Sequence, residues 1–358
     1  MKKERNSNIE ILRIIAMLFI VISHYTVHSG INLTTLPLGV NRFILEVTRF
    51  GNIGVIIFML ISGYNLIEQK SIQLKKVLKL YLQILFYTVV VYLVFIMIGL
   101  ETFSISGLIK NSLPFIFNRY WFATAYIILY LLSPFINKFL HSLSRKEHLT
   151  FLVIMLILFS IIPTFTNQNP YGNQLVQFLM FYSIGAYFKK YNDNLFNKKK
   201  INIILLISSI SLLVLSVIAL DFLGNKMGTS KDLAYYFFNR RSIISILFSV
   251  TFFNLFVNKK PFSNKFINKI AICAFGVYLI HDNKLVKGVL WELFENTNYF
   301  NSGKLIIHMI ITIIIVYTAC TIIEYIRINL VERPFFKVLG NKIDKLELYL
   351  KTKLLGAN

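Results

Sequence analysis

Charged residues are scarce in this chain. Only 15% of its 358 residues are Asp, Glu, Lys or Arg, whereas 56% are hydrophobic and the mean hydropathy is +0.64. Such a composition excludes a disordered chain and disfavours a soluble globular domain. The 33 Phe and 19 Tyr point the same way. We therefore expect apolar segments long enough to cross a lipid bilayer.

Of the charged residues, the acidic ones are the scarcer kind. They number 16 against 38 Lys and Arg, which leaves a net charge of +22. In a soluble protein this excess would favour nucleic acid as a partner. Here the basic residues stand in short runs between apolar segments, a distribution typical of membrane topology. We therefore expect contact with membrane lipid and no nucleic-acid partner.

The chain also lacks a cysteine framework and an extended linker. Its two cysteines, Cys273 and Cys320, lie in apolar stretches without metal-ligand spacing, so we interpret both as core residues and expect no metal site. No Pro-, Gly- or Ser-rich linker leads to a soluble domain. Any chemistry must therefore be done by the membrane helices themselves.

Ten segments are apolar over roughly the 17 to 25 residues that a helix needs to cross the hydrocarbon layer. They span residues 9–28, 51–67, 80–99, 121–137, 149–165, 175–188, 201–221, 242–257, 270–281 and 305–326, of which the sixth and the ninth are short. The first is interrupted by Glu10 and Arg13 and is followed by no small-residue cleavage site. We therefore interpret it as a retained span and not as a cleaved signal peptide.

The distribution of Lys and Arg sets the orientation of these segments. With the N-terminus inside, the cytoplasmic segments carry 26 basic residues and the outer loops carry 11, which is the asymmetry of the positive-inside rule. The sequence thus predicts an all-α, polytopic integral membrane protein with about ten transmembrane helices and both termini in the cytoplasm.

The last 21 residues form a tail of different character. Its apolar residues lie on one helical face, with lysines between them: Leu339, Ile343, Leu346 and Leu350. This pattern fits an interfacial helix, and a solvated cytoplasmic helix is the alternative. We therefore divide the chain into a transmembrane domain, 1–337, and a cytoplasmic amphipathic tail, 338–358.

Two ionisable residues lie within the first span, where such residues are costly and by default suggest a functional site. Arg13 and His24 are 11 residues apart. That spacing is about 20° past three helical turns, so both side chains lie on one helix face, about 16 Å apart. Snorkelling of Arg13 and an interfacial His24 are the structural alternative. The shared face favours a functional interpretation, with a cation inside and an acid/base group toward the outside.

The second and third spans carry the next candidates. The segment FMLISGYNLI (58–67) contains Ser62-Gly63, either a helix-packing notch or a substrate contact, followed by Tyr64. The segment KKVLKLY (75–81) places Lys76 and Lys79 one turn apart, where they can hold a cytoplasmic phosphate. Positive-inside topology explains the same lysines without a ligand.

The fourth and ninth spans supply candidates on the outer side. Trp121 lies at the outer interface, where an aromatic belt is the favoured interpretation and sugar stacking the alternative. The segment VYLIHDN (277–283) puts His281 and Asp282 at the outer boundary, and two histidines at one membrane face favour a site there. We interpret the remaining ionisable residues of the tenth span as structural: His308, Glu324 and Arg327.

Together these segments resemble the acyltransferase-3 family of polytopic membrane enzymes. EILRIIAMLFIVISHY resembles its first helix, in which a basic residue, ten further residues and a histidine follow one another, here Arg13 and His24. FMLISGY, YWFATAYIILYLLSP and VYLIHDN resemble its Ser-Gly-Phe/Tyr, aromatic and Tyr-x-x-His motifs. IEYIRINLVERPFFK resembles its closing Glu-x-Pro segment, here Glu332 and Pro334. The resemblance covers residues 9 to about 337.

One motif departs from the family. Members often carry Arg-x-x-Arg after the second helix, whereas this chain has Lys76-x-x-Lys79. A lysine keeps a point-charge contact with phosphate but loses the bidentate geometry of arginine.

The family transfers acyl groups, often acetyl from acetyl-CoA, to hydroxyls of surface carbohydrates, peptidoglycan or exported small molecules. The resemblance therefore implies a multi-pass membrane O-acyltransferase of the bacterial plasma membrane, acting on a surface polysaccharide or its lipid-linked precursor. Acetyl-CoA or another acyl-CoA would be the donor substrate, and we expect no bound cofactor. The acceptor, the acyl group and any homo-oligomer stay open.

For this reaction we expect the donor phosphates at Lys76 and Lys79, near Arg13. His24 would take the proton of the acceptor hydroxyl or carry the acyl group itself. The candidates for the acceptor site are Ser62, Tyr64, Trp121, His281 and Asp282. The rival function is an exporter of polysaccharide or lipid-linked sugar without acyl transfer. The shared face of Arg13 and His24, and the lack of matched Pro/Gly-broken helices in the two halves, favour the enzyme.

Overall fold

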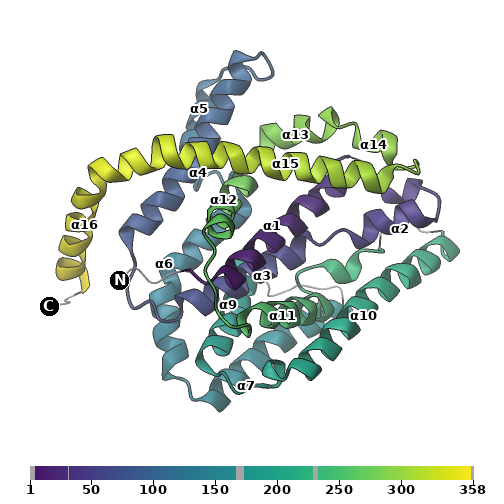
Figure 1. Cartoon of the computed structure of the whole chain (residues 1–358), viewed down its shortest axis with the longest axis horizontal. Helices are drawn as coiled ribbons and strands as arrows, with labels where there is room; N and C mark the ends of the chain where they lie inside the picture. Colours follow the sequence, from purple (N-terminus) through teal and green to yellow (C-terminus); the bar gives the residue numbers. More distant parts are fainter. Residues whose placement is uncertain (1–4, 31, 167–172, 229–232, 356–358) are drawn as a thin grey trace.

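The computed structural model describes residues 5–30, 32–166, 173–228 and 233–355, and every regular element within them is helical. The long helices form one bundle (Figure 1): α1 (Ser7–Val27), α3 (Gly51–Leu66), α4 (Leu74–Met97), α6 (Trp121–Ser142), α7 (Arg145–Leu156), α9 (Gln174–Lys190), α10 (Lys199–Lys226), α11 (Ile243–Val257), α12 (Lys265–His281), α15 (Leu305–Arg327) and α16 (Arg333–Leu355). Shorter helices connect them: α2 (Val40–Val47), α5 (Ile105–Ser112), α8 (Ile162–Thr166), α13 (Lys284–Leu293) and α14 (Asn296–Tyr299).

Each of the ten apolar segments expected to span the membrane falls on a helix, so the all-helical class is confirmed. Within the described ranges, seven helical stretches are long and apolar enough to cross a bilayer. The other three expected spans lie on α9, α11 and α12, which have 15 to 17 residues. Ten crossings, and the side on which the termini lie, stay predictions.

The burial of the helices varies with their place in the bundle. In Figure 1, α1, α3 and α9 lie at its centre, whereas α10 runs along one flank. More than half of the apolar window of α1 is buried, but less than a fifth of that of α10. Exposed apolar side chains such as Ile207 and Leu215 cover α10, as expected of a helix that faces lipid.

The centre of the bundle depends on close contact between α3 and α9. A Cβ atom on Gly63 would collide with the backbone oxygen of Tyr182, and one on Gly185 would collide with that of Leu60. Small residues allow such backbone approach in membrane bundles. The packing interpretation of Ser62-Gly63 is thereby confirmed for Gly63.

The C-terminal tail continues α15. A π-helical turn, Ile328–Glu332, joins α15 to α16, and the helix shows no break at the expected boundary of 337 (Figure 1). Nζ of Lys75 lies 3.2 Å from Oδ2 of Asp344, and the backbone N–H of Leu74 donates to Oε2 of Glu347 at 2.8 Å. The tail therefore packs beside the start of α4. Its position at a membrane surface stays a prediction.

Candidate active site

The His24 side chain lies where the last turn of α1 meets the end of α12. These two helices are neighbours in the bundle. Nδ1 of His24 lies 3.0 Å from Nε2 of His281 and 4.0 Å from Oδ1 of Asp282. The structure thus brings together three of the residues singled out in the sequence, although about 257 positions separate the two histidines.

The hydrogen bonds assign the protons on the two imidazole rings. Nδ1 of His281 lies 2.6 Å from the carbonyl oxygen of Val277, which can only accept, so this nitrogen carries a proton. In a neutral His281 ring Nε2 then accepts, and Nδ1 of His24 donates to it. His24 is thereby held in the tautomer whose Nε2 has a free lone pair. This is the state that a general base needs.

Asp282 supplies negative charge beside the two rings. Its Oδ1 lies 3.3 Å from Nε2 of His28 and 3.5 Å from Nζ of Lys287. Burial favours the neutral acid, but the hydrogen bond with His28, the attraction of His24 when that ring is protonated and the charge of Lys287 outweigh it and lower the pKa of Asp282 to about 2. The carboxylate is therefore ionised near neutral pH and can stabilise a protonated His24.

The same residues could hold a metal ion. One ring nitrogen each of His24 and His28 and one oxygen of Asp282 lie within 4.8 Å of one another, and two imidazoles with a carboxylate suit Zn²⁺. However, the ammonium group of Lys287 lies against the same carboxylate oxygen. A second cation would have to displace it, so the donor set suits proton transfer better than metal binding.

A cavity of about 170 Å³ opens beside His24, and we call it the His24 cavity. Its lining includes Asp282, Tyr278, Trp121 and Asn52. The Tyr278 hydroxyl interacts with the neighbouring Asp282 carboxylate. The volume equals roughly six water molecules at about 30 Å³ each. It therefore fits the reacting ends of two substrates and not either substrate as a whole.

A second cavity, of about 390 Å³, lies toward the start of α1, and we call it the inner cavity. Four cationic side chains line it: Arg5, Arg13, Lys76 and Lys79. None of the described lining residues is acidic. The structure thus gathers the three cations expected to meet the donor and adds Arg5 to them.

Carboxylates behind the lining neutralise part of this charge. Oε2 of Glu10 lies 2.7 Å from Nη1 of Arg13 and 3.8 Å from Nη1 of Arg5. Oε1 of Glu332 lies 2.6 Å from Nζ of Lys79. Four cations thus face two carboxylates. The remaining positive charge suits a phosphate-bearing ligand.

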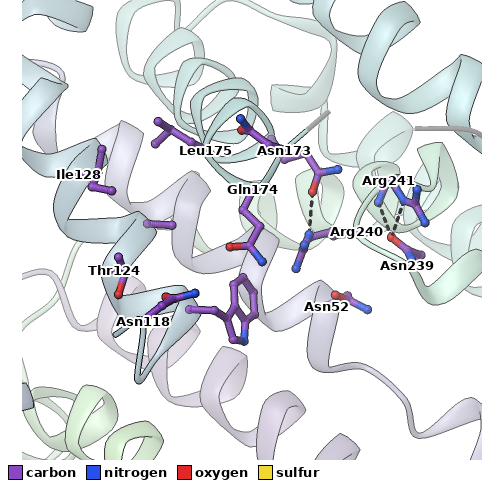
Figure 2. A pocket seen from close by; sticks show the side chains of 13 residues that line it. Asn52, Asn118, Thr124, Ile128, Asn173, Gln174, Leu175, Asn239, Arg240 and Arg241 are labelled. Atoms are coloured by element: carbon purple, nitrogen blue, oxygen red, sulfur yellow. Dashed lines mark hydrogen bonds between the residues drawn. The ribbon is translucent and has the colours of Figure 1, made fainter. Parts of the chain in front are cut away.

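A third cavity, of about 750 Å³, lies at the starts of α3, α6 and α9, and we call it the outer cavity (Figure 2). It shares Asn52 and Trp121 with the His24 cavity. The His24 cavity in turn shares Met17 and Phe122 with the inner cavity. His24 therefore lies at the junction between a cationic cavity and a polar one.

Two acceptor-site candidates lie away from His24. Ser62 lines the inner cavity, and its hydroxyl donates to the carbonyl of Phe58 at 2.7 Å. Tyr64 lines none of the three cavities, and its ring packs against Phe253 and lies 4.9 Å from Nζ of Lys189. The geometry favours a donor-side place for Ser62 and a packing role for Tyr64.

His308 also lies outside this site. Its Nδ1 is 2.8 Å from the hydroxyl of Tyr25, and its ring stacks on Tyr299 with centroids 3.7 Å apart. These contacts agree with the structural role expected of it.

The family's sequence profile, described as an acyltransferase domain, matches residues 6–325. The chain therefore belongs to the acyltransferase-3 family, as the motifs indicated, and acyltransferase activity is the general activity of this family. No curated protein and no solved structure matches the chain.

Proposed function

We propose that this protein is an O-acyltransferase, in the simplest case an O-acetyltransferase, of the bacterial plasma membrane. It moves an acyl group from acyl-CoA to a hydroxyl of a cell-surface polysaccharide or of its lipid-linked precursor. One observation carries the proposal. The imidazole of His24, with a free lone pair at Nε2, lines a small cavity between the cationic inner cavity and the polar outer cavity. A catalyst that joins two substrates needs such a junction.

The inner cavity is the site for the donor. Phosphate groups of acyl-CoA would meet Arg5, Arg13, Lys76 and Lys79, whose charge their carboxylate partners only partly neutralise. The pantetheine arm would extend along α1 to the His24 cavity. The side chains shared by the two cavities, Met17 and Phe122, are 2% and 7% exposed. They must therefore shift when the thioester reaches His24.

The chemistry needs one proton acceptor and support for two charges. Nε2 of His24 takes the proton of the acceptor hydroxyl while the hydroxyl oxygen attacks the thioester carbonyl carbon. His281 and the Asp282 carboxylate stabilise the imidazolium. Tyr278 lines the His24 cavity, and its hydroxyl is the available donor to the developing oxyanion. The carbon–sulfur bond then breaks, and the CoA thiolate receives the proton from His24.

The test uses purified full-length protein in lipid nanodiscs with radiolabelled acetyl-CoA. The acceptor is polysaccharide from cells that lack the gene, because its hydroxyls should be free. We expect label in the polysaccharide that mild base releases, together with acyl ester signals that are present in the NMR spectrum of wild-type polysaccharide and missing in that of the deletion strain. An exporter would instead transfer no label, and its deletion would reduce the polysaccharide itself.

A further inference from the structure

The outer cavity has the composition of a binding site for an anion. Its volume of about 750 Å³ lies within the range of roughly 300–1,000 Å³ that is typical of small-molecule sites. Two guanidinium groups line it, those of Arg240 and Arg241. None of the described lining residues is acidic, so nothing in the lining neutralises these charges (Figure 2).

The surrounding helices add positive potential. Asn52 lies in the first turn of α3, Trp121 begins α6, Gln174 begins α9, and Arg241 stands two residues before α11. The N-terminal end of a helix carries a partial positive charge and exposes backbone N–H groups. The starts of α3 and α6 have no side-chain cap. The starts of three helices therefore line one cavity that already contains two arginines, and the start of α11 lies close to it.

The structure orients Arg240 without neutralising it. Its Nε donates to Oε1 of Gln177 at 2.6 Å, and its guanidinium lies 4.8 Å from the ring centroid of Trp121. Gln177 is buried, so this contact fixes the guanidinium firmly. No described residue pairs with its two terminal nitrogens, which leaves a planar fork suited to a carboxylate or a phosphate.

The rest of the lining suits sugar hydroxyls. Uncharged hydrogen-bonding side chains line the same cavity: Asn52, Asn118, Thr124, Asn173, Gln174 and Asn239 (Figure 2). Amide groups donate and accept at once, as hydroxyls do. The Trp121 ring adds an apolar face and also lines the His24 cavity. A ligand in the outer cavity would therefore reach the base.

We infer that the outer cavity binds an anionic glycan, whose carboxylate or phosphate group pairs with Arg240 while a hydroxyl of the same or the next sugar reaches His24. The inference rests on the proposed function, because it names the chemical class of the acceptor. Arg240 and Arg241 select the acidic glycan, Trp121 and the amides position its sugar rings, and neutral glycans bind less tightly because they leave the guanidinium groups unpaired.

The test measures binding without a donor. Full-length protein in phosphatidylcholine nanodiscs is applied to an array of acidic and neutral bacterial surface polysaccharides, in which uronate-bearing and phosphate-bearing glycans form separate groups. We expect retained glycans to come from one of the acidic groups and to be lost as salt rises. Arg240→Gln should weaken their binding at least tenfold, and Arg240→Lys should restore part of it. The matched control is Lys226→Gln, which removes an exposed charge at the end of α10 and should leave binding within twofold.

Retention of neutral glycans only, of no glycan, or of acidic glycans to an equal extent by Arg240→Gln would overturn the inference. Its failure and that of the proposed function are distinguishable. Acyl transfer to a neutral polysaccharide that is unaffected by Arg240→Gln would keep the function and refute the anionic acceptor. Arg240-dependent binding of acidic glycans without any acyl transfer would keep the site and refute the enzyme.

Discussion

Among the clusters of ionisable side chains in the described part of the bundle, the one around Glu324 and the one around His24 differ in how their hydrogen-bonding groups are used. Around Glu324 nearly every group has an ionic or strongly polar partner. Arg327 binds both oxygens of Glu324 at 2.7 and 2.8 Å and also Oε2 of Glu332 at 2.6 Å. Gln83 and Tyr87 donate to the same Glu324 carboxylate at 2.9 and 2.6 Å.

The cluster around His24 is instead incomplete. His281 and Asp282 occupy the Nδ1 side of the His24 ring, but Nε2 has no hydrogen-bond partner among the described residues and the ring lines a cavity. A structural polar cluster therefore differs from a reactive one in whether all its hydrogen-bonding groups have partners, and not in whether it carries charge. A cluster whose hydrogen-bonding groups are all paired stabilises the fold, whereas a free lone pair beside a cavity can react.

The largest effect of a substitution on stability is expected in the cluster around Glu324. Glu324→Ala leaves Arg327 buried beside a single remaining carboxylate, and breaking a buried ion pair typically costs about 3–5 kcal/mol. The thermal unfolding temperature in detergent should therefore fall strongly. Asp344→Ala is the control, because its pair with Lys75 is exposed and should contribute about 0–1 kcal/mol. Equal losses in the two variants would refute the distinction.

A smaller effect, on turnover alone, is expected at Asp282. Asp282→Asn keeps the size of the side chain and removes the charge that supports a protonated His24, so turnover should fall about tenfold, or about 1.4 kcal/mol. The pKa of Asp282 is lowered to about 2, so the wild-type group loses its charge only as the pH falls toward that value. Activity between pH 5 and 8 should therefore show no step from Asp282. Glu292→Gln on the exposed side of α13 is the control, and an equal loss there would contradict the role of Asp282.

Substitutions in the inner cavity should change the affinity for the donor. Replacing Lys76 and Lys79 together with Gln should raise the KM for acyl-CoA severalfold to about tenfold and leave that for the acceptor unchanged, since lost ground-state binding appears in KM. Lys75→Gln is the control, because Lys75 pairs with Asp344 outside the cavity. Equal rises in both KM values would indicate damaged folding in place of a donor site.

The two ends of the bundle should also differ in exposure to the outside of the cell. Both native cysteines are buried, so a new cysteine can be labelled with an impermeant reagent against a low background. In intact cells we expect Asn298→Cys to react and Leu195→Cys to react only after lysis. Labelling of position 195 from outside would refute the proposed orientation.

The sequence allowed much of the site to be predicted where a signal is local. The spacing of Arg13 and His24 follows from helix geometry, and hydropathy located every long helix except α16, which its amphipathic pattern indicated. His28 was not singled out, although it lies four residues after His24 on the same helix face and the periodicity could have indicated it. Lys287 was not singled out either, although it follows Asp282 by only five residues; the turn from α12 into α13 brings its ammonium group to that carboxylate.

The outer cavity shows the limit of such reasoning. Arg240 and Arg241 entered the sequence interpretation only as positive charges of an outer loop. Their role depends on the starts of α3, α6 and α9, which meet at this cavity, and on Gln177, more than 60 positions away in the chain. No local pattern encodes that meeting, whereas a base and a cation on one helix are visible from their spacing.

Turnover of purified His24→Gln protein, measured beside its thermal unfolding temperature, tests the catalytic role of His24 most directly. Gln retains the size and a hydrogen bond but cannot take up the proton, so we predict that turnover falls by roughly 10²-fold or more while the unfolding temperature barely changes. His308→Gln, a membrane histidine outside the three cavities, should keep its turnover. Acyl transfer by His24→Gln at a near wild-type rate would contradict the assignment of His24 as the base.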